Sequence, residues 1–530
     1  MLMQRWNGYG EETISYPLSN SVKAYFARIL GQSRRPQDVD RKTIHIAPAY
    51  SFSQPHPLLQ FDDDIRLRHA LGQSFPDLAS KRFGSFQRFP DAVAFPESDQ
   101  DVTELLAWAR KAGAQVIPYG GGTSVVGGVN PSRREDDDRP VLTISLSRLN
   151  ELQNLDSTSQ LATFGAGVIG PYVESQLRAY GFTLGHYPQS FEFSSLGGWI
   201  ATRSSGQQSL GYGRIEALFA GGKIETPSGR IVLPALPASA AGPDLRQLIL
   251  GSEGRFGIIT EATVRVRPVP KFEAFYGVMF SDWLTGIEAV RQAIQADIPL
   301  SMMRLSNPTE TETFLNLPAH QNQVELLRTL LKWRNFTPEN CLLLFGVSGD
   351  HVATRVARRE MMDIARHHRG LWLTELVGRQ WAKGRFRTAY LRDALWEYGY
   401  AVDTLETAVP WNMVHKASQA ILDALTGAVQ PLLPMAHLSH VYRDGASLYF
   451  TFLFRIGDTL DETMARWRTL KEAGSRAVLS VGGTISHQHG VGVDHLSYLA
   501  QEKSELGIQM LKEVQKSLDP AGVMNPGKLV

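Results

Sequence analysis

The sequence has very little cysteine. Cys341 is the single cysteine among 530 residues, and it lies in the apolar run Cys-Leu-Leu-Leu-Phe. One thiol excludes an intramolecular disulfide and a cysteine metal cluster, and it suits a reducing compartment. We expect Cys341 to be a core thiol. A chain of this length buries enough apolar surface to fold without such covalent or metal staples.

Excess charge and long apolar runs are also missing. The chain carries 54 basic and 53 acidic residues, for a formal net charge of +1. Without a basic tract it has no electrostatic signature of nucleic-acid binding, so we predict no nucleic-acid partner. No apolar run approaches the roughly 18 residues of a spanning helix, and the first residues contain no secretory signal. We therefore expect a cytoplasmic protein.

A glycine-rich turn is the most informative feature that is present. Residues 118–129 read Pro-Tyr-Gly-Gly-Gly-Thr-Ser-Val-Val-Gly-Gly-Val. A predicted strand at 92–95, a helix that begins with a capping box at Ser98 and a strand at 115–117 lead into this turn. Consecutive bare N–H groups can form an anion-binding concavity there. The spacing fits neither the dinucleotide fingerprint nor a P-loop, and on the residues alone an ordinary surface turn is an equal alternative.

Two further glycine-containing regions follow. Residues 186–206 combine paired glycines with small hydroxyl residues, and residues 251–260 read Gly-Ser-Glu-Gly-Arg-Phe-Gly-Ile-Ile-Thr. Such backbone can pack flat against a planar ring system, because few side chains intervene. Three loops in this order, separated by predicted strands, resemble the FAD-binding domain of the vanillyl-alcohol-oxidase family.

Within that family the sequence is similar to the alkyldihydroxyacetonephosphate synthases. The similarity covers nearly the whole chain and is most specific across residues 185–270. It is carried by the segments at residues 5–10, 190–199, 202–206, 251–254, 259–263, 267–270 and 405–411. It implies an α+β fold with a PCMH-type FAD-binding domain of two subdomains and an α+β cap domain.

The expected domain organisation follows from this resemblance and from Pro268 and Pro270, which end a predicted strand. Residues 1–89 form an N-terminal extension that is partly helical, and residues 90–270 form the FAD-binding domain. Residues 271–530 form the cap, or substrate, domain, with a C-terminal segment that returns to the FAD domain. No peroxisomal address of the family is recognisable at the N-terminus, which suits a bacterial chain.

The resemblance assigns the cofactor-binding residues position by position. They are Pro118, Tyr119, Gly120, Gly121, Gly122, Thr123 and Ser124 in the first loop, Gln189, Ser190, Phe191, Glu192, Phe193, Ser194, Ser195, Thr202, Arg203, Ser204 and Ser205 in the second region, and Glu253, Gly254, Arg255, Phe256, Gly257, Ile258 and Ile259 in the third. Several relatives carry a histidine in the first loop that bonds the flavin. Tyr119 and Thr123 flank the glycines here, so we predict that FAD binds non-covalently.

The resemblance also assigns roles in the cap domain. Arg304 falls on an activity-critical arginine, Arg392 on the arginine that binds the substrate phosphate, and Tyr449 on the catalytic tyrosine. His487 and His489 fall on a histidine cluster that moves protons with this tyrosine.

Each of these residues also has a plainer interpretation. Arg392 could pair with Asp393 at the surface, and Tyr449 could be a core residue with a satisfied hydroxyl. His487 and His489 could ligate a metal, but no carboxylate or cysteine ligand lies near them in sequence, so we predict no metal site.

The implied reaction exchanges the acyl group of acyl-dihydroxyacetone phosphate for a long-chain alcohol through a flavin N5 adduct, in ether-lipid synthesis. One departure concerns the histidine cluster, where Gln488 replaces a histidine of the family. On a strand Gln488 faces away from His487 and His489, so we expect synthase chemistry to survive. The alternative is an FAD-linked dehydrogenase or oxidase of a hydroxy acid or alcohol, which the C-terminal residues 524–528 resemble. A flavin-binding protein without catalysis is a third hypothesis.

A small-molecule lipid substrate is the partner that the resemblance implies, and a homodimer is a further hypothesis. Residues 324–336 place an apolar stripe among basic residues, as in an interfacial helix. This pattern also fits an ordinary core-facing helix, which we favour on pattern alone. Peripheral contact with the inner membrane face is therefore the weaker of two interpretations.

Overall fold

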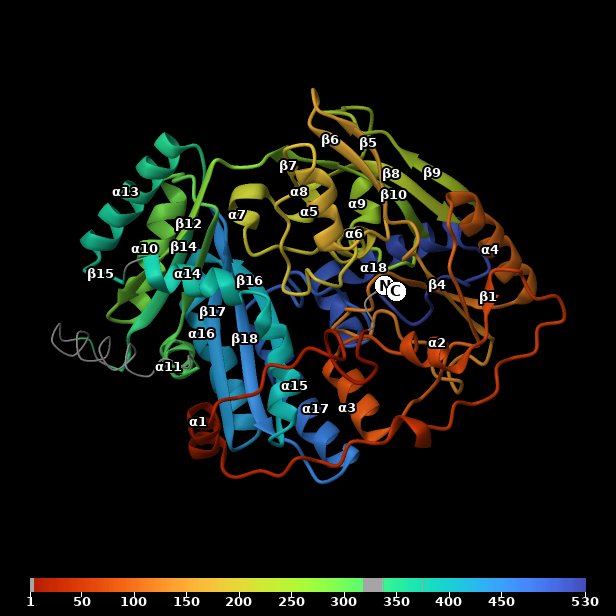
Figure 1. Cartoon of the computed structure of the whole chain (residues 1–530), viewed down its shortest axis with the longest axis horizontal. Coiled ribbons are helices and arrows are strands. Elements are labelled where there is room, and N and C mark those ends of the chain that lie inside the picture. The colour runs from red at the N-terminus through yellow and green to blue at the C-terminus, as the bar shows by residue number, and fades with distance from the viewer. Residues whose placement is uncertain (1–3, 318–335, 337, 374) are drawn as a thin grey trace.

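The computed structural model describes residues 4–317, 336, 338–373 and 375–530. Within these ranges three larger sheets organise the chain, two beside the glycine-rich loops and one in the C-terminal half (Figure 1). The elements that precede β2 (Ala92–Ala94) include α1 (Asn20–Leu30), the 3-10 helix η1 (Arg41–Thr43), α2 (Asp63–Arg68) and α3 (Phe75–Phe83).

The first sheet contains the β-α-β unit that the sequence predicts. Its strand order is β1 (Leu59–Gln60), β2 (Ala92–Ala94), β4 (Val141–Ser145) and β3 (Gln115–Tyr119). α4 (Asp99–Ala112) connects β2 to β3, and the predicted capping box is confirmed: Ser98 Oγ accepts from the N–H of Asp101 at 3.1 Å. Gly113 ends the helix at φ 65°, a left-handed conformation in which glycine avoids the usual Cβ penalty.

The second sheet is antiparallel and lies beside the first. Its strand order is β5 (Leu152–Asp156), β6 (Leu161–Gly165), β10 (Ile258–Arg265), β8 (Phe219–Thr226) and β9 (Gly229–Leu233). A pair of two-residue strands, β7 (Phe182–Thr183) and β11 (Arg267–Pro268), closes this region. The helices here are α5 (Gly170–Arg178), α6 (Leu196–Thr202), α7 (Ser209–Tyr212), α8 (Ile215–Leu218) and α9 (Arg246–Ile249).

The third sheet is larger, and each of its neighbouring strand pairs is antiparallel. Its strand order is β15 (Leu371–Trp372), β12 (Phe272–Phe280), β14 (Cys341–Gly349), β13 (Met302–Ser306), β17 (Leu432–Val441), β18 (Gly445–Arg455) and β16 (Tyr400–Pro410). Its helices are α10 (Trp283–Gln295), α11 (Pro308–Asn316), α13 (His351–His367), α14 (Glu375–Gly384), η2 (Arg387–Tyr390), α15 (Leu391–Trp396), α16 (Trp411–Ala428) and α17 (Leu460–Ser480).

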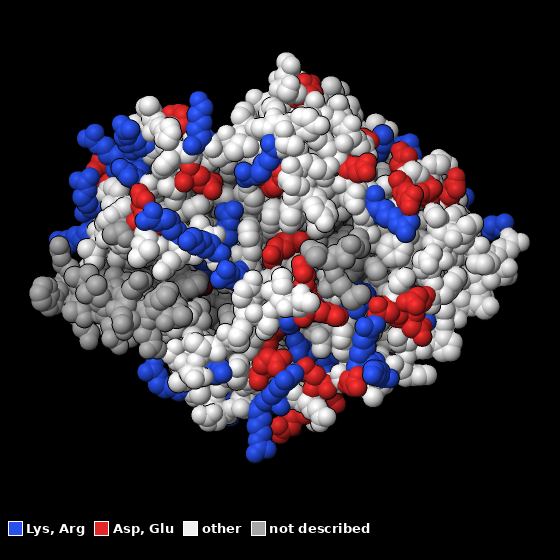
Figure 2. All heavy atoms as spheres, in the orientation of Figure 1, with Lys and Arg blue, Asp and Glu red and all other residues white. Residues whose placement is uncertain are grey.

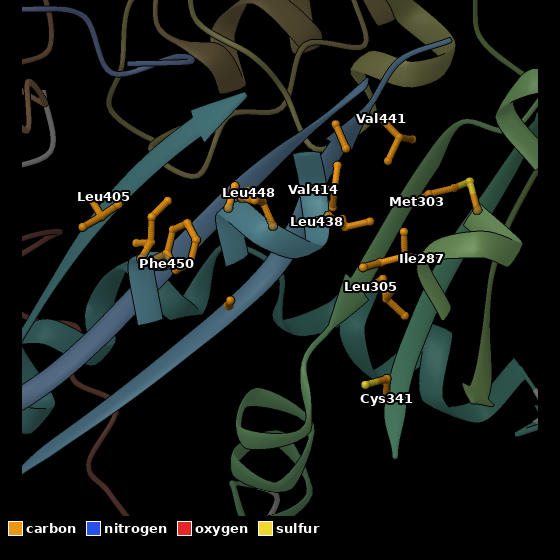
Figure 3. Close-up of a cluster of buried hydrophobic side chains, with 14 of the residues drawn as sticks. Ile287, Met303, Leu305, Cys341, Leu405, Val414, Leu438, Val441, Leu448 and Phe450 are labelled. Atoms are coloured by element: carbon orange, nitrogen blue, oxygen red, sulfur yellow. The ribbon is translucent and has the colours of Figure 1, made fainter. Parts of the chain in front are cut away.

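The two faces of this third sheet have different roles. Leu448, Phe450 and Phe452 of β18 enter the main core with apolar residues of α10, α13, α16 and α17. Figure 3 shows Leu448 and Phe450 in this core. Cys341 lies in the same core and is fully buried, which confirms the predicted core thiol. Because successive strand residues point to opposite faces, Tyr449 lies on the other face, toward the glycine-rich loops.

The C-terminal residues return to the first two sheets. After η3 (Leu496–Tyr498), α18 (Leu499–Leu518) packs apolar side chains against the core of the second sheet. Met524 then forms a parallel bridge with Val116 of β3. The end of the chain therefore supports the strand that leads into the first glycine loop.

The face of the molecule seen in Figure 2 shows no field of a single charge sign. Basic and acidic side chains are interspersed over the face seen in Figure 2. Among the helices that the structure describes, none combines the length and apolar character needed to cross a bilayer.

Candidate active site

A cavity of about 440 Å³ lies between the glycine-rich loops and the third sheet. Its lining on one side comes from the turn after β3, from α6 and its flanks, and from the turn before β10. Strands β13, β16, β17 and β18 supply the opposite side, together with α15 and the loop at residues 488–489. The cavity therefore brings together segments that are distant in sequence.

The first glycine loop forms a wall without side-chain bulk. All seven predicted residues, 118–124, line the cavity. A Cβ on Gly121 would lie 1.8 Å from the carbonyl oxygen of Phe193, and one on Gly120 would lie 2.1 Å from Ser195 Oγ. Glycine is needed because the first loop packs directly on the second.

The second and third regions supply most of the remaining loop wall. Predicted residues that line the cavity here are Gln189, Ser190, Ser194, Ser195, Thr202, Ser204, Ser205, Glu253, Gly254, Gly257, Ile258 and Ile259. Ser195 also caps α6, because its Oγ accepts from the N–H of Gly198 at 3.3 Å. The N-terminus of α6 thus faces the same wall as the glycine loop.

Six predicted cofactor residues do not line the cavity. Phe191 stacks on Phe386 with ring centroids 5.1 Å apart, and Phe256 lies in the core of the second sheet. Phe193 packs edge-on against an aromatic ring, and Glu192 lies beside Tyr390. The other two are arginines whose side chains bind backbone carbonyls, Arg203 that of Leu250 and Arg255 that of Met524. These residues support the loops from behind.

Arg304 of β13 belongs to a charged cluster with Glu310 of α11 and His437 of β17. Its Nη2 donates to Glu310 Oε1 at 3.0 Å, and His437 Nδ1 lies 3.0 Å from the same oxygen. Burial alone would raise the pKa of Glu310, but the hydrogen bond from His437 and the charge of Arg304 outweigh burial and hold the pKa below its usual value. Burial and Arg304 lower the pKa of His437, so the ring is neutral and donates to the carboxylate. Arg304 Nε is buried without a partner among the described residues.

Tyr449 lies in a row across the sheet, opposite His437 on one side and Glu406 on the other. Its ring stacks on His437 at 5.1 Å and meets His489 edge-on at 5.6 Å. The hydroxyl donates to Thr404 Oγ1 at 3.1 Å, and burial raises the pKa of Tyr449, so the hydroxyl keeps its proton. Tyr449 thus presents a protonated phenol at the cavity.

The histidine segment is a loop and not a strand, which corrects the predicted geometry. Glu406 Oε1 accepts from the backbone N–H groups of His487, Gln488 and His489, at 3.2, 2.6 and 2.9 Å. Three consecutive N–H groups that converge on one oxygen curl the chain, so side chains no longer alternate between two faces.

The curled loop changes which residues reach the cavity. Gln488 and His489 line it, whereas His487 turns away, its Nε2 accepting from Arg214 at 2.9 Å and lying 2.6 Å from the Tyr442 hydroxyl. The expected grouping of the two histidines against Gln488 is therefore wrong. Gln488 Oε1 instead accepts from His440 Nε2 at 3.1 Å.

Glu253 fixes the other end of this loop. It was predicted as a cofactor residue, but its carboxylate accepts from the N–H groups of Val491 at 2.5 Å and Gly492 at 2.7 Å. Burial raises the pKa of Glu253 to about 7, although these two hydrogen bonds act in the opposite direction. One glutamate from each side of the cavity, Glu253 and Glu406, therefore holds the histidine loop.

Arg392 does not form the surface ion pair with its sequence neighbour Asp393 that the sequence allows. Asp393 pairs with Arg82 at 2.6 Å. Arg392 Nη1 donates to the carbonyl of Gln73 at 2.5 Å, and its Nε and Nη2 are buried without a partner in the described structure. An unpaired guanidinium edge that lines a cavity can bind an anion.

The cavity residues that were not predicted from the sequence include Glu310, His437 and His440. The two histidines both lie on β17. A β-bulge between Leu438 and His440 shifts the alternation and turns His440 to the cavity side with His437. Sequence periodicity alone places these two histidines on opposite faces.

Comparisons with known proteins identify the family of this chain. Residues 90–233 match the family model described as FAD binding domain, and residues 269–529 match FAD linked oxidases, C-terminal domain. The alkyldihydroxyacetonephosphate synthase of Dictyostelium discoideum is 30% identical over 99% of this chain and 93% of its own length. The chain belongs to the alkyldihydroxyacetonephosphate synthase family. The synthase of Trypanosoma brucei brucei is 31% identical over 89% of this chain and 78% of its own.

Solved structures support the same family. A structure of alkyldihydroxyacetonephosphate synthase is 27% identical, covers 99% of both chains and has a TM-score of 0.85. p-Cresol methylhydroxylase, at 13% identity and a TM-score of 0.68, shares the fold. An FAD-linked oxidoreductase of Escherichia coli (strain K12) is 25% identical over 84% of this chain. The predicted family, the PCMH-type fold and the dependence on FAD are confirmed, and this member of the synthase family is an FAD-dependent enzyme.

Proposed function

We propose that this chain is an alkyldihydroxyacetonephosphate synthase that exchanges the acyl group of acyl-dihydroxyacetone phosphate for a long-chain alcohol, in ether-lipid synthesis. The observation that carries the proposal is the composition of one cavity. It joins the flavin loops to an unpaired guanidinium edge, to a Tyr449–His489 pair and to an apolar wall. The apolar side chains of this wall are Met302, Phe314, Leu317, Trp381, Leu391, Val402 and Met435.

The loops fit FAD without a covalent bond. Residues 120–122 leave a bare backbone at which a Cβ would collide, and serine and threonine hydroxyls line the adjoining wall. Tyr119 is not a candidate for attachment, because its hydroxyl donates to the carbonyl of Arg68 at 3.2 Å. When bound, FAD supplies a nucleophilic nitrogen for covalent exchange at a substrate carbon. The protein supplies orientation and proton transfer.

Arg392 binds the phosphate of the substrate in this proposal. Its free Nε and Nη2 offer the forked geometry that suits phosphate oxygens. The carbonyl of Gln73 holds Nη1 and fixes the orientation of the group. Arg304 also lines this cavity and is held by Glu310, so we assign it to the stabilisation of negative charge on the substrate.

His489 and Tyr449 move the proton at the reacting carbon. Burial lowers the pKa of His489, so its imidazole is neutral and can accept a proton. Tyr449 is protonated and can donate one. His487 was expected to share this role, but it points to Arg214 and Tyr442, so we assign it to the support of the loop.

The reaction itself tests the proposal. The holoenzyme is incubated with palmitoyl-dihydroxyacetone phosphate and labelled hexadecanol, and ether product and released palmitate are measured. We expect both to form in equal amounts with no net reduction of an electron acceptor. If ether product is absent and a hydroxy acid or alcohol bleaches the flavin instead, the synthase proposal is wrong and the hypothesis of an FAD-linked dehydrogenase replaces it.

Membrane contact, a homodimer and a cytoplasmic location remain predictions. The proposed interfacial helix at residues 324–336 lies, apart from Phe336, outside the described residues. Co-sedimentation with anionic vesicles at low salt tests the membrane contact, and light scattering tests the dimer.

A further inference from the structure

The N-terminal segment forms a strap beside the cavity. Gln4 and Glu11 form an antiparallel bridge, and Arg5 donates its N–H to the carbonyl of Gly10 at 2.7 Å, so the residues between them make a tight loop. Tyr9 lies in this loop and lines the cavity. Figure 1 shows the segment in red near α15 and α3. A residue from the beginning of the chain thus completes a wall made by residues hundreds of positions away.

The strap is anchored next to Arg392. The N–H of Tyr9 donates to Asp393 Oδ2 at 2.9 Å, and the carbonyl of Gly8 accepts from Gln73 Nε2 at 3.0 Å. Gln73 also accepts the hydrogen bond from Arg392 through its own carbonyl. One residue, Gln73, therefore links the strap to the guanidinium.

Two glycines bring the strap close to its support. A Cβ on Gly8 would lie 2.4 Å from Asp393 Oδ1, and one on Gly10 would lie 2.1 Å from the ring of Tyr390. Gly10 also has φ +90°, which other residues rarely adopt. The backbone of Tyr9 is therefore held between two positions that admit no side chain.

The hydroxyl of Tyr9 is buried and has no hydrogen-bond partner in the described part of the chain. The ring is 7% exposed and is fixed edge-on by Phe193 at 5.3 Å and Tyr390 at 5.2 Å. Burial raises the pKa of Tyr9, so the group is a hydrogen-bond donor. A buried donor left unpaired costs free energy, which a ligand in the cavity can recover.

Glu192 does not accept a hydrogen bond from this hydroxyl in the described structure, and its own Oε2 is buried without a partner there. Glu192 contributes to the raised pKa of Tyr9, but its side chain forms a hydrogen bond with Tyr390 and it does not line the cavity. Arg392 Nε and Nη2 also have no partner among the residues that the structure describes. The cavity wall thus carries two sets of buried donors, from Tyr9 and Arg392, on segments joined through Gln73 and Asp393.

We propose that Tyr9 is a further substrate-binding residue, whose hydroxyl donates a hydrogen bond to the phosphate that Arg392 holds. This inference rests on the proposed function, because it needs a phosphate-bearing substrate. It assigns the N-terminal strap to substrate recognition, as a preformed half of the phosphate site.

The test uses the FAD-loaded enzyme and the variant Tyr9→Phe, which removes the hydroxyl and keeps the ring. Binding of dihydroxyacetone phosphate and of unphosphorylated dihydroxyacetone is followed by calorimetry, and KM and kcat are measured with the acyl substrate. Tyr16→Phe is the matched control, since Tyr16 also meets Tyr390 edge-on but is exposed and does not line the cavity.

A hydrogen bond to a charged group predicts a loss of roughly 10- to 100-fold in affinity for dihydroxyacetone phosphate in Tyr9→Phe. We expect KM to rise by a similar factor, kcat to change by less than about 3-fold, and dihydroxyacetone binding to stay unchanged. Tyr16→Phe should behave as wild type in each assay.

Three outcomes overturn the inference. Unchanged phosphate affinity in Tyr9→Phe would show that the hydroxyl does not bind the substrate. An equal loss of dihydroxyacetone binding, or a lower melting temperature with normal phosphate affinity, would assign it to packing.

If the enzyme makes no ether product yet loses dihydroxyacetone phosphate affinity in Tyr9→Phe, the proposed function fails and the phosphate site stands.

Discussion

Glu406→Gln tests whether one carboxylate sets the position of the catalytic histidine. The side chain of Glu406 is fully buried, and its Oε1 accepts from three consecutive N–H groups while lying 3.4 Å from His489 Nδ1. Glutamine keeps the size and one carbonyl oxygen but removes the charge. The three N–H groups of the loop then bind a neutral oxygen more weakly, so the curled conformation is less stable and His489 shifts away from Tyr449.

The expected magnitude follows from the number and kind of hydrogen bonds. A charge-assisted bond contributes about 1.5–3 kcal/mol and a neutral one about 0.5–1.5 kcal/mol, so each contact weakens by about 1–1.5 kcal/mol. The three bonds share one oxygen and are not additive, which gives a total near 2–3 kcal/mol. If that energy maintains the reactive position of His489, kcat/KM falls by about 30- to 150-fold.

Steady-state ether formation and FAD content per chain are measured side by side. Glu502→Gln is the matched control, because Glu502 accepts from Ile485 at 3.0 Å at the start of the same loop and does not line the cavity. It should cost less than about 3-fold. A Glu406→Gln enzyme with full FAD and unchanged kcat/KM would refute the reasoning, and a loss that only parallels lost FAD would assign Glu406 to folding.

Three other predictions follow from the cavity and its surroundings. Acid precipitation should release the yellow chromophore into the supernatant, because no covalent bond to FAD is expected; colour in the pellet would contradict this. Gln488→His should lower kcat/KM by about 10-fold, since it replaces the acceptor of His440 in the cavity wall, and an unchanged rate would show that this contact is irrelevant. The third prediction concerns pH: burial first, and Lys471 second, lower the pKa of His495 to about 3. Below pH 6.5 the unfolded state therefore binds a proton that the folded state does not, and stability is lost as pH falls toward 3. At pH 5 this costs about 2 kcal/mol, so the melting temperature of His495→Asn should fall less between pH 7.5 and pH 5 than that of wild type, and parallel falls would contradict the assignment.

Features with a local cause could be predicted from the sequence. The capping box at Ser98 and the strand–helix–strand unit follow from residues within a few positions of one another. The glycine loop at residues 120–122 is equally local, because a backbone that must approach another backbone admits no Cβ. The buried thiol of Cys341 follows from its apolar neighbours. These elements carry enough pattern to identify the family and the fold.

The orientation of the cap residues was decided by tertiary contacts. The sequence places His487 and His489 on one face, but Glu406 on a distant strand collects the N–H groups of the loop and separates them. The bulge in β17 turns His440 inward, which strand periodicity does not predict.

Arg392 shows the same dependence on distant residues. Asp393, its neighbour in sequence, pairs with Arg82 from α3, and the guanidinium edge of Arg392 has no partner within the described ranges. The physical reason is common to these cases. A charged group chooses among all the partners that the fold brings within hydrogen-bond distance, and the sequence nearby does not reveal which one it meets.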